Sequence, residues 1–447
     1  MDERGDILNT ILVFILFFVS LLYSVYQGVS ILYSLILGLV CFTLVSLSKG
    51  YKLKELYKMM GKGSKKSLIV IRIFVLIGVI TAVWRASGTI AFIVYYGILF
   101  MSAKYFILSA FVLCCIVSFL LGTSFGTVGT IGVILMVLAK SGSVDTNVTA
   151  GAIIAGAYFG DRCSPMSSSA NLVAVLTNTE LYINIKNMMK TSIIPFVLSI
   201  IGYIFLSQGH PLVFYDNQIG NAILNSFNIS TIVLFPAIVI LFLAAFRFDV
   251  QLSMSISILS GILIGIFVQH ITFWAMLNYI VIGYHLDGAD FLGEIMQGGG
   301  LYSMLKVSLI VLISSAYSGI FEGTGLLREI ECFFEVFSQK IGVYSAVIVS
   351  SIATAAFSCN QTLAVMLTHQ FEHKIYEKRE ISNYQLALDL ENTVILISAL
   401  IPWNIAGAVP AAAISADSGF IIYALYLFLV PLTNLFTRKW LPQNGIF

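Results

Sequence analysis

Long apolar runs separated by short polar segments set the pattern of this sequence. A helix needs about 20 mostly apolar residues to span a bilayer. Runs of that length or slightly less occupy residues 7–26, 31–47, 68–83, 105–121, 193–206, 231–246, 252–268, 301–320, 343–357 and 420–436. With the shorter apolar pieces between them, they predict an all-α polytopic membrane protein of about 10–12 transmembrane helices.

Six apolar stretches are interrupted by small or polar residues. The centres of the interruptions are Gly88, Gly126 and Pro165 in the first half, and Glu322, Asn360 and Pro402 in the second. The two sets are offset by 234, 234 and 237 positions (322 − 88, 360 − 126 and 402 − 165). Backbone that leaves the helix in a bilayer must be buried or line a polar cavity. Matched interruptions therefore predict an inverted repeat of broken or re-entrant helices around a transport site, although such glycines can also serve close helix packing alone.

These interruptions divide the chain into five parts. We expect an N-terminal helical hairpin with a basic cytoplasmic loop, a first transport repeat, connecting helices, a second transport repeat and a C-terminal tail. Their predicted boundaries are residues 1–66, 67–208, 209–300, 301–437 and 438–447. The two repeats are expected to superpose with opposite orientations in the membrane.

The composition agrees with a membrane protein. Hydrophobic residues make up 59% of the chain and charged residues only 10%, which excludes an ordinary soluble enzyme. The 24 basic and 22 acidic residues nearly balance, so no basic field for nucleic acid exists. No glycine-rich ATP-binding motif and no catalytic constellation is present. We therefore expect neither an ATP-driven pump nor an enzyme, and we expect no cofactor and no resident metal.

The orientation follows from the segment between the second and third apolar runs. Residues 49–66 contain seven lysines and one acid, Glu55. Positively charged loops remain in the cytoplasm. Because two spans precede this loop, we expect a multi-pass protein of the plasma membrane with a cytoplasmic N-terminus.

Three acids are candidates for ion binding because an ionisable group inside a membrane is costly and usually functional. Asp161 follows an apolar stretch at the third interruption, where a carboxylate suits Na⁺ or a proton; a structural ion pair with Arg162 is the alternative. Glu391 lies in the run 386–400, and because Asp389 points to the opposite side of a helix, only one of the two can face the interior. We favour Glu391 because the apolar run continues past it; a position near the helix entry is the alternative. Glu322 either carries a proton or caps the helix that follows it.

Neutral oxygen donors accompany these acids. Hard cations such as Na⁺ bind hydroxyl and carbonyl oxygens, but each of these side chains could instead bond its own helix backbone. The candidates are Thr123, Ser124 and Thr127 at the second interruption, Ser164, Ser167, Ser168, Ser169 and Asn171 around the third, Asn360, Gln361 and Thr362 at the fifth, and Asn392 and Asn404 near the sixth. We expect Asp161 and Asn360 to bind the transported Na⁺, and the polar groups to cluster in one site.

The motifs resemble those of the NhaC family of Na⁺/H⁺ antiporters, within the broad ion-transporter superfamily. The carrying segments are residues 122–130 (GTSFGTVGT), 151–165 (GAIIAGAYFGDRCSP), 322–325 (EGTG), 359–362 (CNQT), 390–392 (LEN) and 401–404 (IPWN). The resemblance extends from about residue 68 to the C-terminus. It implies electrochemically driven exchange of Na⁺ for H⁺, an inverted-repeat fold and a site centred on Asp161.

Two departures from the family pattern leave alternatives open. The family often has an aspartate shortly after the Ser-Pro pair, where this chain has three serines at 167–169, and it often has Glu-Asp where this chain has Glu391-Asn392. The coupling ion and its stoichiometry are therefore open. A Na⁺- or H⁺-coupled carrier of a small organic acid or amino acid is the alternative function, because relatives of the family carry such substrates. A gated channel fits the paired interruptions less well, and a homodimer remains open.

Overall fold

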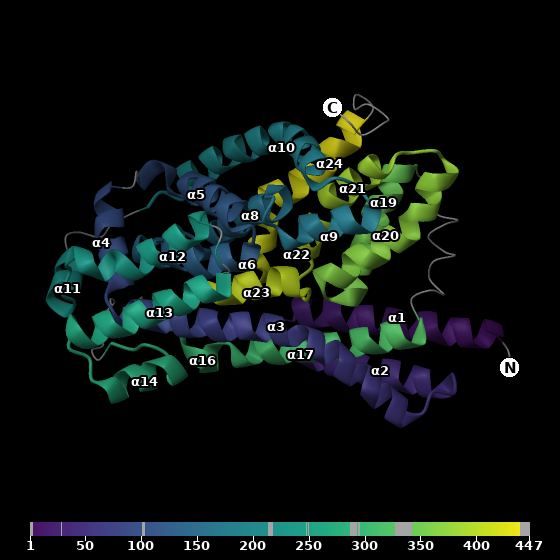
Figure 1. Ribbon diagram of the computed structural model, residues 1–447, viewed down its shortest axis with the longest axis horizontal. Helices are drawn as coiled ribbons and strands as arrows, with labels where there is room; N and C mark the ends of the chain where they lie inside the picture. The colour runs from purple at the N-terminus through teal and green to yellow at the C-terminus, as the bar shows by residue number, and fades with distance from the viewer. Residues whose placement is uncertain are drawn as a thin grey trace.

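Helices form the regular structure of the computed structural model (Figure 1). The structure describes residues 3–27, 29–100, 103–212, 218–246, 248, 250–286, 293, 296–326 and 342–438. Within these ranges no strand is present, and Tyr284 and Gly298 form an isolated bridge. The all-α fold class is confirmed.

The described residues contain several helices suited to a bilayer. Ile31–Ser48, Ala103–Leu121, Ser124–Ser141 and Leu181–Gly209 are each long and apolar enough to cross it. Two further helix pairs pass the same test together but are bent, by 69° between Ile71–Ala86 and Thr89–Gly97 and by 54° between Asn383–Leu400 and Ile405–Ala413. These bends fall at the predicted first and sixth interruptions. The protein is therefore a multi-pass membrane protein with broken helices.

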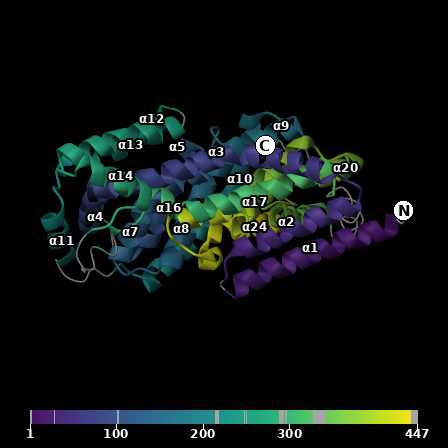
Figure 2. The same ribbon diagram turned by 90° about the horizontal axis from the view of Figure 1, so that it is seen from below.

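The first two helices form a hairpin that packs on the middle of the molecule. Helices α1 (Glu3–Tyr26) and α2 (Ile31–Ser48) lie along one side of the molecule, with α17 (Leu305–Thr324) beside α2 (Figure 2). Aromatic rings fill the contact, with centroids 4.9 Å apart for Phe14 and Phe42 and 4.6 Å apart for Phe42 and Phe321.

The predicted basic loop at 49–66 is wrong over most of its length. Helix α3 runs from Leu53 to Ala86, so only residues 49–52 connect two helices. The segment is helical because its Lys, Leu, Met and Glu residues favour a helix. The Glu55 side chain accepts a hydrogen bond from the Lys52 backbone N–H at 3.1 Å, which completes the first turn. Leu56 is fully buried and anchors this turn to the rest of the protein.

Helices α3 and α17 cross where both have glycine. A Cβ added to Gly63 would lie 2.0 Å from the Ser315 carbonyl oxygen and 2.9 Å from the Gly319 Cα. One added to Gly319 would lie 2.3 Å from the Met59 carbonyl oxygen. The two backbones therefore touch along this seam, as small residues allow in membrane helices.

The connecting helices gather at one end of the molecule, at the left in Figure 1. They are α11 (Gln218–Ser226), α12 (Phe235–Ala245), α13 (Val250–Phe267), α14 (Phe273–Ile282) and α16 (Gly300–Ser303). This region contacts the first broken pair through hydrogen bonds, including one from Gln269 Nε2 to the Ser87 carbonyl at 3.2 Å. Trp84 Nε1 donates to Ser257 Oγ at 3.0 Å, and Thr89 Oγ1 donates to the Val233 carbonyl at 2.7 Å.

Two series of helices follow one another at a constant spacing. The first comprises α5 (Phe106–Leu121), α6 (Ser124–Thr127), α8 (Thr146–Cys163) and α9 (Ser168–Thr177). The second comprises α19 (Val343–Ser358), α20 (Gln361–Lys378), α21 (Asn383–Asn392) and α23 (Ile405–Ala413), with α22 (Val394–Leu400) between the last two. Each counterpart begins 237 positions after its partner (343 − 106, 361 − 124, 383 − 146 and 405 − 168).

The cap residues share this spacing. Thr123, Asp145 and Ser167 accept backbone N–H groups at the starts of α6, α8 and α9. At the positions 237 residues later, Asn360, Ser382 and Asn404 do the same for α20, α21 and α23. Side-chain caps satisfy the orphan N–H groups at helix starts. The equal spacing supports the predicted repeat; the domain boundaries and the relative orientation of the halves stay predictions.

Candidate functional site

A cavity of about 380 Å³ lies where the helix breaks of both halves meet. Helices α3, α17, α20 and the starts of α6, α9 and α23 surround it, and α8 ends there. Its lining residues are Gly63, Ile73, Thr123, Ser124, Phe125, Asp161, Ser168, Ser315, Ser318, Glu322, Asn360, Gln361, Thr362, Leu363, Met366, Ile405 and Ala406. Eight of the predicted site residues are among them: Thr123, Ser124, Asp161, Ser168, Glu322, Asn360, Gln361 and Thr362.

Asp161 lies in the last turn of α8 and is 5% exposed. Ser124 Oγ donates to its Oδ2 at 3.5 Å, a long contact, and the Gln361 side chain lies beside the carboxyl group. The Asp161 carbonyl accepts hydrogen bonds from Ser167 Oγ and, at 2.8 Å, from Ser169 Oγ. These serines replace the helical bonds that the break removes. The carboxylate therefore retains free acceptor capacity toward the cavity.

Four helices begin at the cavity. Ser124, Ser168, Gln361 and Ile405 are the first residues of α6, α9, α20 and α23, and all four line it. Helix N-termini carry partial positive charge. They therefore stabilise a carboxylate at the position of Asp161 without neutralising it.

Helix α17 forms the opposite wall. Ser315, Ser318 and Glu322 line the cavity from three successive turns, and Gly63 of α3 lies beside them. Sequence reasoning found Glu322 but missed the two serines. The available signal was their spacing, because residues three and four apart share one face of a helix. Glu322 belongs to the last turn of α17. The alternative that it caps a following helix concerns residues that lie outside the described ranges.

Seven of the predicted neutral ligands do not line the cavity. Two of them, Ser167 and Ser169, donate to the Asp161 carbonyl. Thr127 Oγ1 donates to the Thr123 carbonyl at 2.8 Å, and Asn171 Nδ2 donates to the Ser167 carbonyl at 2.6 Å. These are bonds to the helix backbone, the alternative that the sequence left open. The other three also bond protein groups. Ser164 Oγ accepts from the Met166 N–H, and Asn392 accepts from Arg162. Asn404 caps α23 and donates to the Ala355 carbonyl.

The expectation that only one of Asp389 and Glu391 faces the interior is wrong, because both are buried. They are 2% and 0% exposed. Helix α21 is surrounded by α9, α10, α19, α20 and α24, so both of its sides lie in protein. Glu391 does not line the cavity, and Asp389 belongs to a separate polar cluster.

Arg162 does not pair with Asp161; no ion pair joins these two described residues. Its guanidinium donates to neutral groups instead. Nη2 reaches Thr191 Oγ1 at 2.9 Å and the Met188 carbonyl at 3.3 Å, and Nη1 reaches Tyr426 Oη at 3.0 Å. It also donates to Ser192 and Asn392. Arg162 thus points away from the cavity and ties α8 to α10 (Leu181–Gly209) and α24 (Leu425–Thr437).

Comparison with known proteins decides the family. A model described as the Na⁺/H⁺ antiporter family matches residues 7–170 and 156–435. The chain belongs to the Na⁺/H⁺ antiporter family. It is 30% identical over 410 residues to the Na(+)/H(+) antiporter NhaC of Bacillus subtilis, covering 90% of each chain. It is 29% identical over 391 residues to NhaC of Alkalihalophilus pseudofirmus, covering 85% of this chain and 84% of that one.

More distant relatives are named for organic substrates. The chain is 25% identical over 416 residues to the malate-2H(+)/Na(+)-lactate antiporter of Bacillus subtilis, covering 90% and 88% of the two chains. It is 26% identical over 375 residues to the arginine/ornithine antiporter ArcD of Halobacterium salinarum, covering 82% and 77%. The predicted resemblance to the antiporter family is confirmed.

For a member of this family, the chemistry of the lining is informative. Asp161 and Glu322 supply two carboxylates, and serine, threonine, asparagine and glutamine supply neutral oxygens. No Lys, Arg or His is among the lining residues. This set can hold a hard cation or a proton. It offers an organic anion no basic side chain with which to pair.

Proposed function

We propose that this chain is a secondary active transporter of the plasma membrane that exchanges Na⁺ for H⁺, with Asp161 at the centre of its site. The observation that carries the proposal is a buried carboxylate at a helix break, facing a cavity. The described residues line this cavity with neutral oxygens and a second carboxylate, Glu322, and with no basic side chain. The names of the NhaC relatives support the same exchange.

Competition at Asp161 couples the two ions. Na⁺ binds the ionised carboxylate together with neutral oxygens such as those of Ser124, Gln361 and Asn360, whereas a proton removes the charge that Na⁺ needs. A lower pH therefore weakens Na⁺ binding. Alternating access then requires one repeat to move against the other, and the constant spacing of the two helix series supports such a pair of repeats.

The orientation and assembly belong to the same proposal. Exposed lysines at 52, 54, 58, 62 and 65 cover the first turns of α3, with Glu55 as the acid among them. Such a basic segment remains on the cytoplasmic side, and two spans precede it, so we place the N-terminus there as well. A homodimer stays a prediction that the mass of the purified protein in detergent tests.

Purified protein in proteoliposomes tests the exchange. A proton gradient directed outward, with the vesicle interior acidic, should drive ²²Na⁺ uptake. An inward Na⁺ gradient should move protons out of protein-containing vesicles. Vesicles without protein are the control. Absence of Na⁺ movement under both gradients would overturn the proposal.

A second function is favoured by the size of the cavity. At about 30 Å³ per water, 380 Å³ exceeds the space that one Na⁺ and its ligands need. The malate/lactate and arginine/ornithine relatives show that family members are named for small organic substrates. A coupled carrier of an organic acid or amino acid would show Na⁺ movement that requires the organic substrate. Full exchange in its absence argues for the simple antiporter.

A further inference from the structure

Glu391 is a fully buried acid whose carboxylate has no partner. It is 0% exposed, and neither Oε1 nor Oε2 accepts a hydrogen bond from any residue that the structure describes. An unpaired buried carboxylate is costly enough that it usually neutralises instead. Its burial therefore calls for an ion or a proton that the fold itself does not provide.

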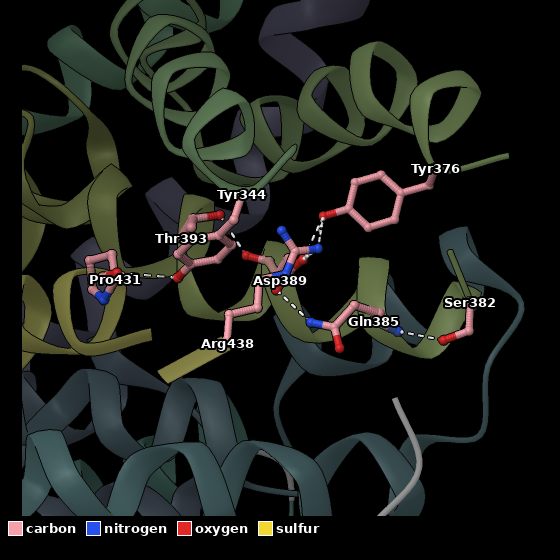
Figure 3. Close-up of polar contacts among 8 residues, drawn as sticks. All are labelled: Tyr344, Tyr376, Ser382, Gln385, Asp389, Thr393, Pro431 and Arg438. Atoms are coloured by element: carbon pink, nitrogen blue, oxygen red, sulfur yellow. Dashed lines mark hydrogen bonds and ion pairs between the residues drawn. The ribbon is translucent and has the colours of Figure 1, made fainter. Parts of the chain in front are cut away.

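Asp389, two residues earlier on α21, provides the contrast. Arg438 Nη2 lies 2.8 Å from its Oδ2, Tyr376 Oη donates to the same oxygen at 2.5 Å, and Gln385 Nε2 donates to Oδ1 at 2.8 Å. Figure 3 shows these side chains converging on Asp389 from α20, α21 and the end of α24. The two acids thus share a helix and a depth of burial but differ in their partners.

A buried cation lies near Glu391 without pairing with it. Arg162 is 0% exposed and interacts electrostatically with Glu391. Nevertheless, no ion pair within 4.0 Å joins these two described residues, and every hydrogen bond of the Arg162 guanidinium goes to a neutral group. The two charges belong to different halves of the chain.

We propose that Glu391 is a second transported-proton site, distinct from the cation site at Asp161; this inference rests on the proposed exchange of Na⁺ for H⁺. Na⁺ needs several oxygen ligands, but the Glu391 carboxyl has no hydrogen-bond partner among the described residues and does not line the cavity. A proton needs a single carboxylate oxygen and removes the buried charge.

The step balances as a simple proton transfer. When the proton leaves, the O–H bond of the Glu391 carboxyl breaks, the proton passes to water and the carboxylate keeps the electron pair. The carboxylate then attracts the Arg162 guanidinium, which the protonated form does not. Arg162 directly follows Asp161 in the chain, so its displacement moves the cation site. The proton on one repeat is thereby linked to Na⁺ on the other.

Few other titratable groups face Glu391. Asp161, Arg162 and Cys163 of α8 are those with which it interacts. Helix α9 and helix α22 have no titratable side chain, and the α10 lysines at 186 and 190 are exposed. Tyr426 of α24 bonds Arg162. The titratable groups of α19 and α20 nearest to α21 surround Asp389 instead: Tyr344, Glu372 and Tyr376, together with Arg438.

The proposal predicts the coupling ratio. If Asp161 exchanges one H⁺ for one Na⁺, a second proton on Glu391 makes the exchange about two H⁺ per Na⁺, which responds to membrane potential. Glu391→Gln should lower the ratio to about one and abolish the response. Glu391→Asp should restore both, and Asp389→Asn, the matched control, should keep the wild-type ratio. The ratio is measured in proteoliposomes at imposed pH, Na⁺ and valinomycin–K⁺ potentials.

Three results would overturn the assignment: an unchanged ratio in Glu391→Gln, an equal change in Asp389→Asn, or loss of Na⁺ movement in both Glu391 variants. A second measurement does not depend on transport. A hydrophobic carbodiimide reacts with protonated buried carboxyls, so mass spectrometry of the wild-type protein should find it on Glu391 and not on Asp389. If Glu391 is labelled but Na⁺/H⁺ exchange is absent, only the proposed function is wrong. If exchange occurs but Glu391 is not labelled, the proton site is wrong.

Discussion

At the scale of single residues, the site combines one poorly satisfied carboxylate with neutral oxygens. Among the described residues, Asp161 accepts a hydrogen bond from Ser124 Oγ at 3.5 Å and has the Gln361 and Ser167 side chains beside it, all of them neutral, although it is 5% exposed. Asp389 is buried to a similar degree and has three partners. Acids that a fold merely tolerates are paired in this way. Asp389 has the cationic partner Arg438 and Asp161 has only neutral ones, which supports the proposal that the partner of Asp161 arrives from solution.

Replacing Asp161 by Asn should therefore remove Na⁺ binding while preserving the fold. The amide keeps the volume but loses the charge, and breaking a buried charge interaction costs about 3–5 kcal/mol. This corresponds to at least about a 100-fold loss of affinity. Equilibrium ²²Na⁺ binding to the purified variant checks it, with thermal unfolding as the test of folding. Na⁺ affinity within threefold of wild type would contradict the role given to Asp161.

Asn404 should behave in the opposite way. Its side chain caps α23 by accepting the Ala406 N–H at 3.0 Å, and it donates to the Ala355 carbonyl at 2.8 Å. Asn404→Ala should lower stability by about 1–3 kcal/mol and leave Na⁺ affinity nearly unchanged. Thermal unfolding and ²²Na⁺ binding on the same sample separate the two effects. A large loss of affinity at unchanged stability would make Asn404 a ligand.

These residues show what could be predicted from the sequence. Asp161, Ser124 and Asn360 could be predicted as site residues because a polar residue beside a break in an apolar run has few other roles. The serines of α17 were missed although their spacing from Glu322 was a signal, because a single serine in an apolar helix usually bonds its own backbone. Asn171 and Asn404 show the opposite error: they were predicted as ligands but bond backbone groups instead. Whether a polar side chain caps its helix or faces a cavity depends on neighbours that are distant in sequence.

At the scale of elements, the α3–α17 seam holds the cavity wall in place. Gly63 lines the cavity and also touches α17, so the wall depends on the close contact of two backbones. The sequence did not reveal this seam, because Gly63 lies among lysines in a segment that reads as a polar loop. Tertiary burial of Leu56 and the first-turn hydrogen bond outweigh that polarity.

Adding one methyl group tests the seam. Gly63→Ala would place a Cβ 2.0 Å from the Ser315 carbonyl oxygen, a backbone atom that cannot yield without moving α17. Overpacking of this kind costs about 1–3 kcal/mol. Gly61→Ala on the same helix meets nothing within 4 Å and should be neutral or stabilising by up to about 1 kcal/mol. Thermal unfolding compares the two, and equal midpoints would mean that the helices do not touch there.

At the scale of the whole molecule, two helix series of equal spacing bring their breaks to one cavity. The sequence predicted the breaks and their offset, because backbone chemistry in a membrane restricts where a helix can end. It could not give the constant spacing of 237 residues, which became visible only with the helix starts themselves. The burial of α21 on both of its sides, which encloses Asp389 and Glu391, could not be predicted from the sequence either.

The access route yields the last prediction. The cavity is lined by Gly63 from the basic first half of α3 and opens to the surface. If that segment is cytoplasmic, a cysteine at Ser318 should react with a membrane-impermeant thiol reagent added from the cytoplasmic side, and Na⁺ should slow the reaction. The background is a chain whose six native cysteines are replaced. Ser257→Cys, also on a helix but sealed between α3 and α12, should not react. Reaction only from the outer side would reverse the assigned orientation, and equal reaction at both positions would show that the cavity does not control access.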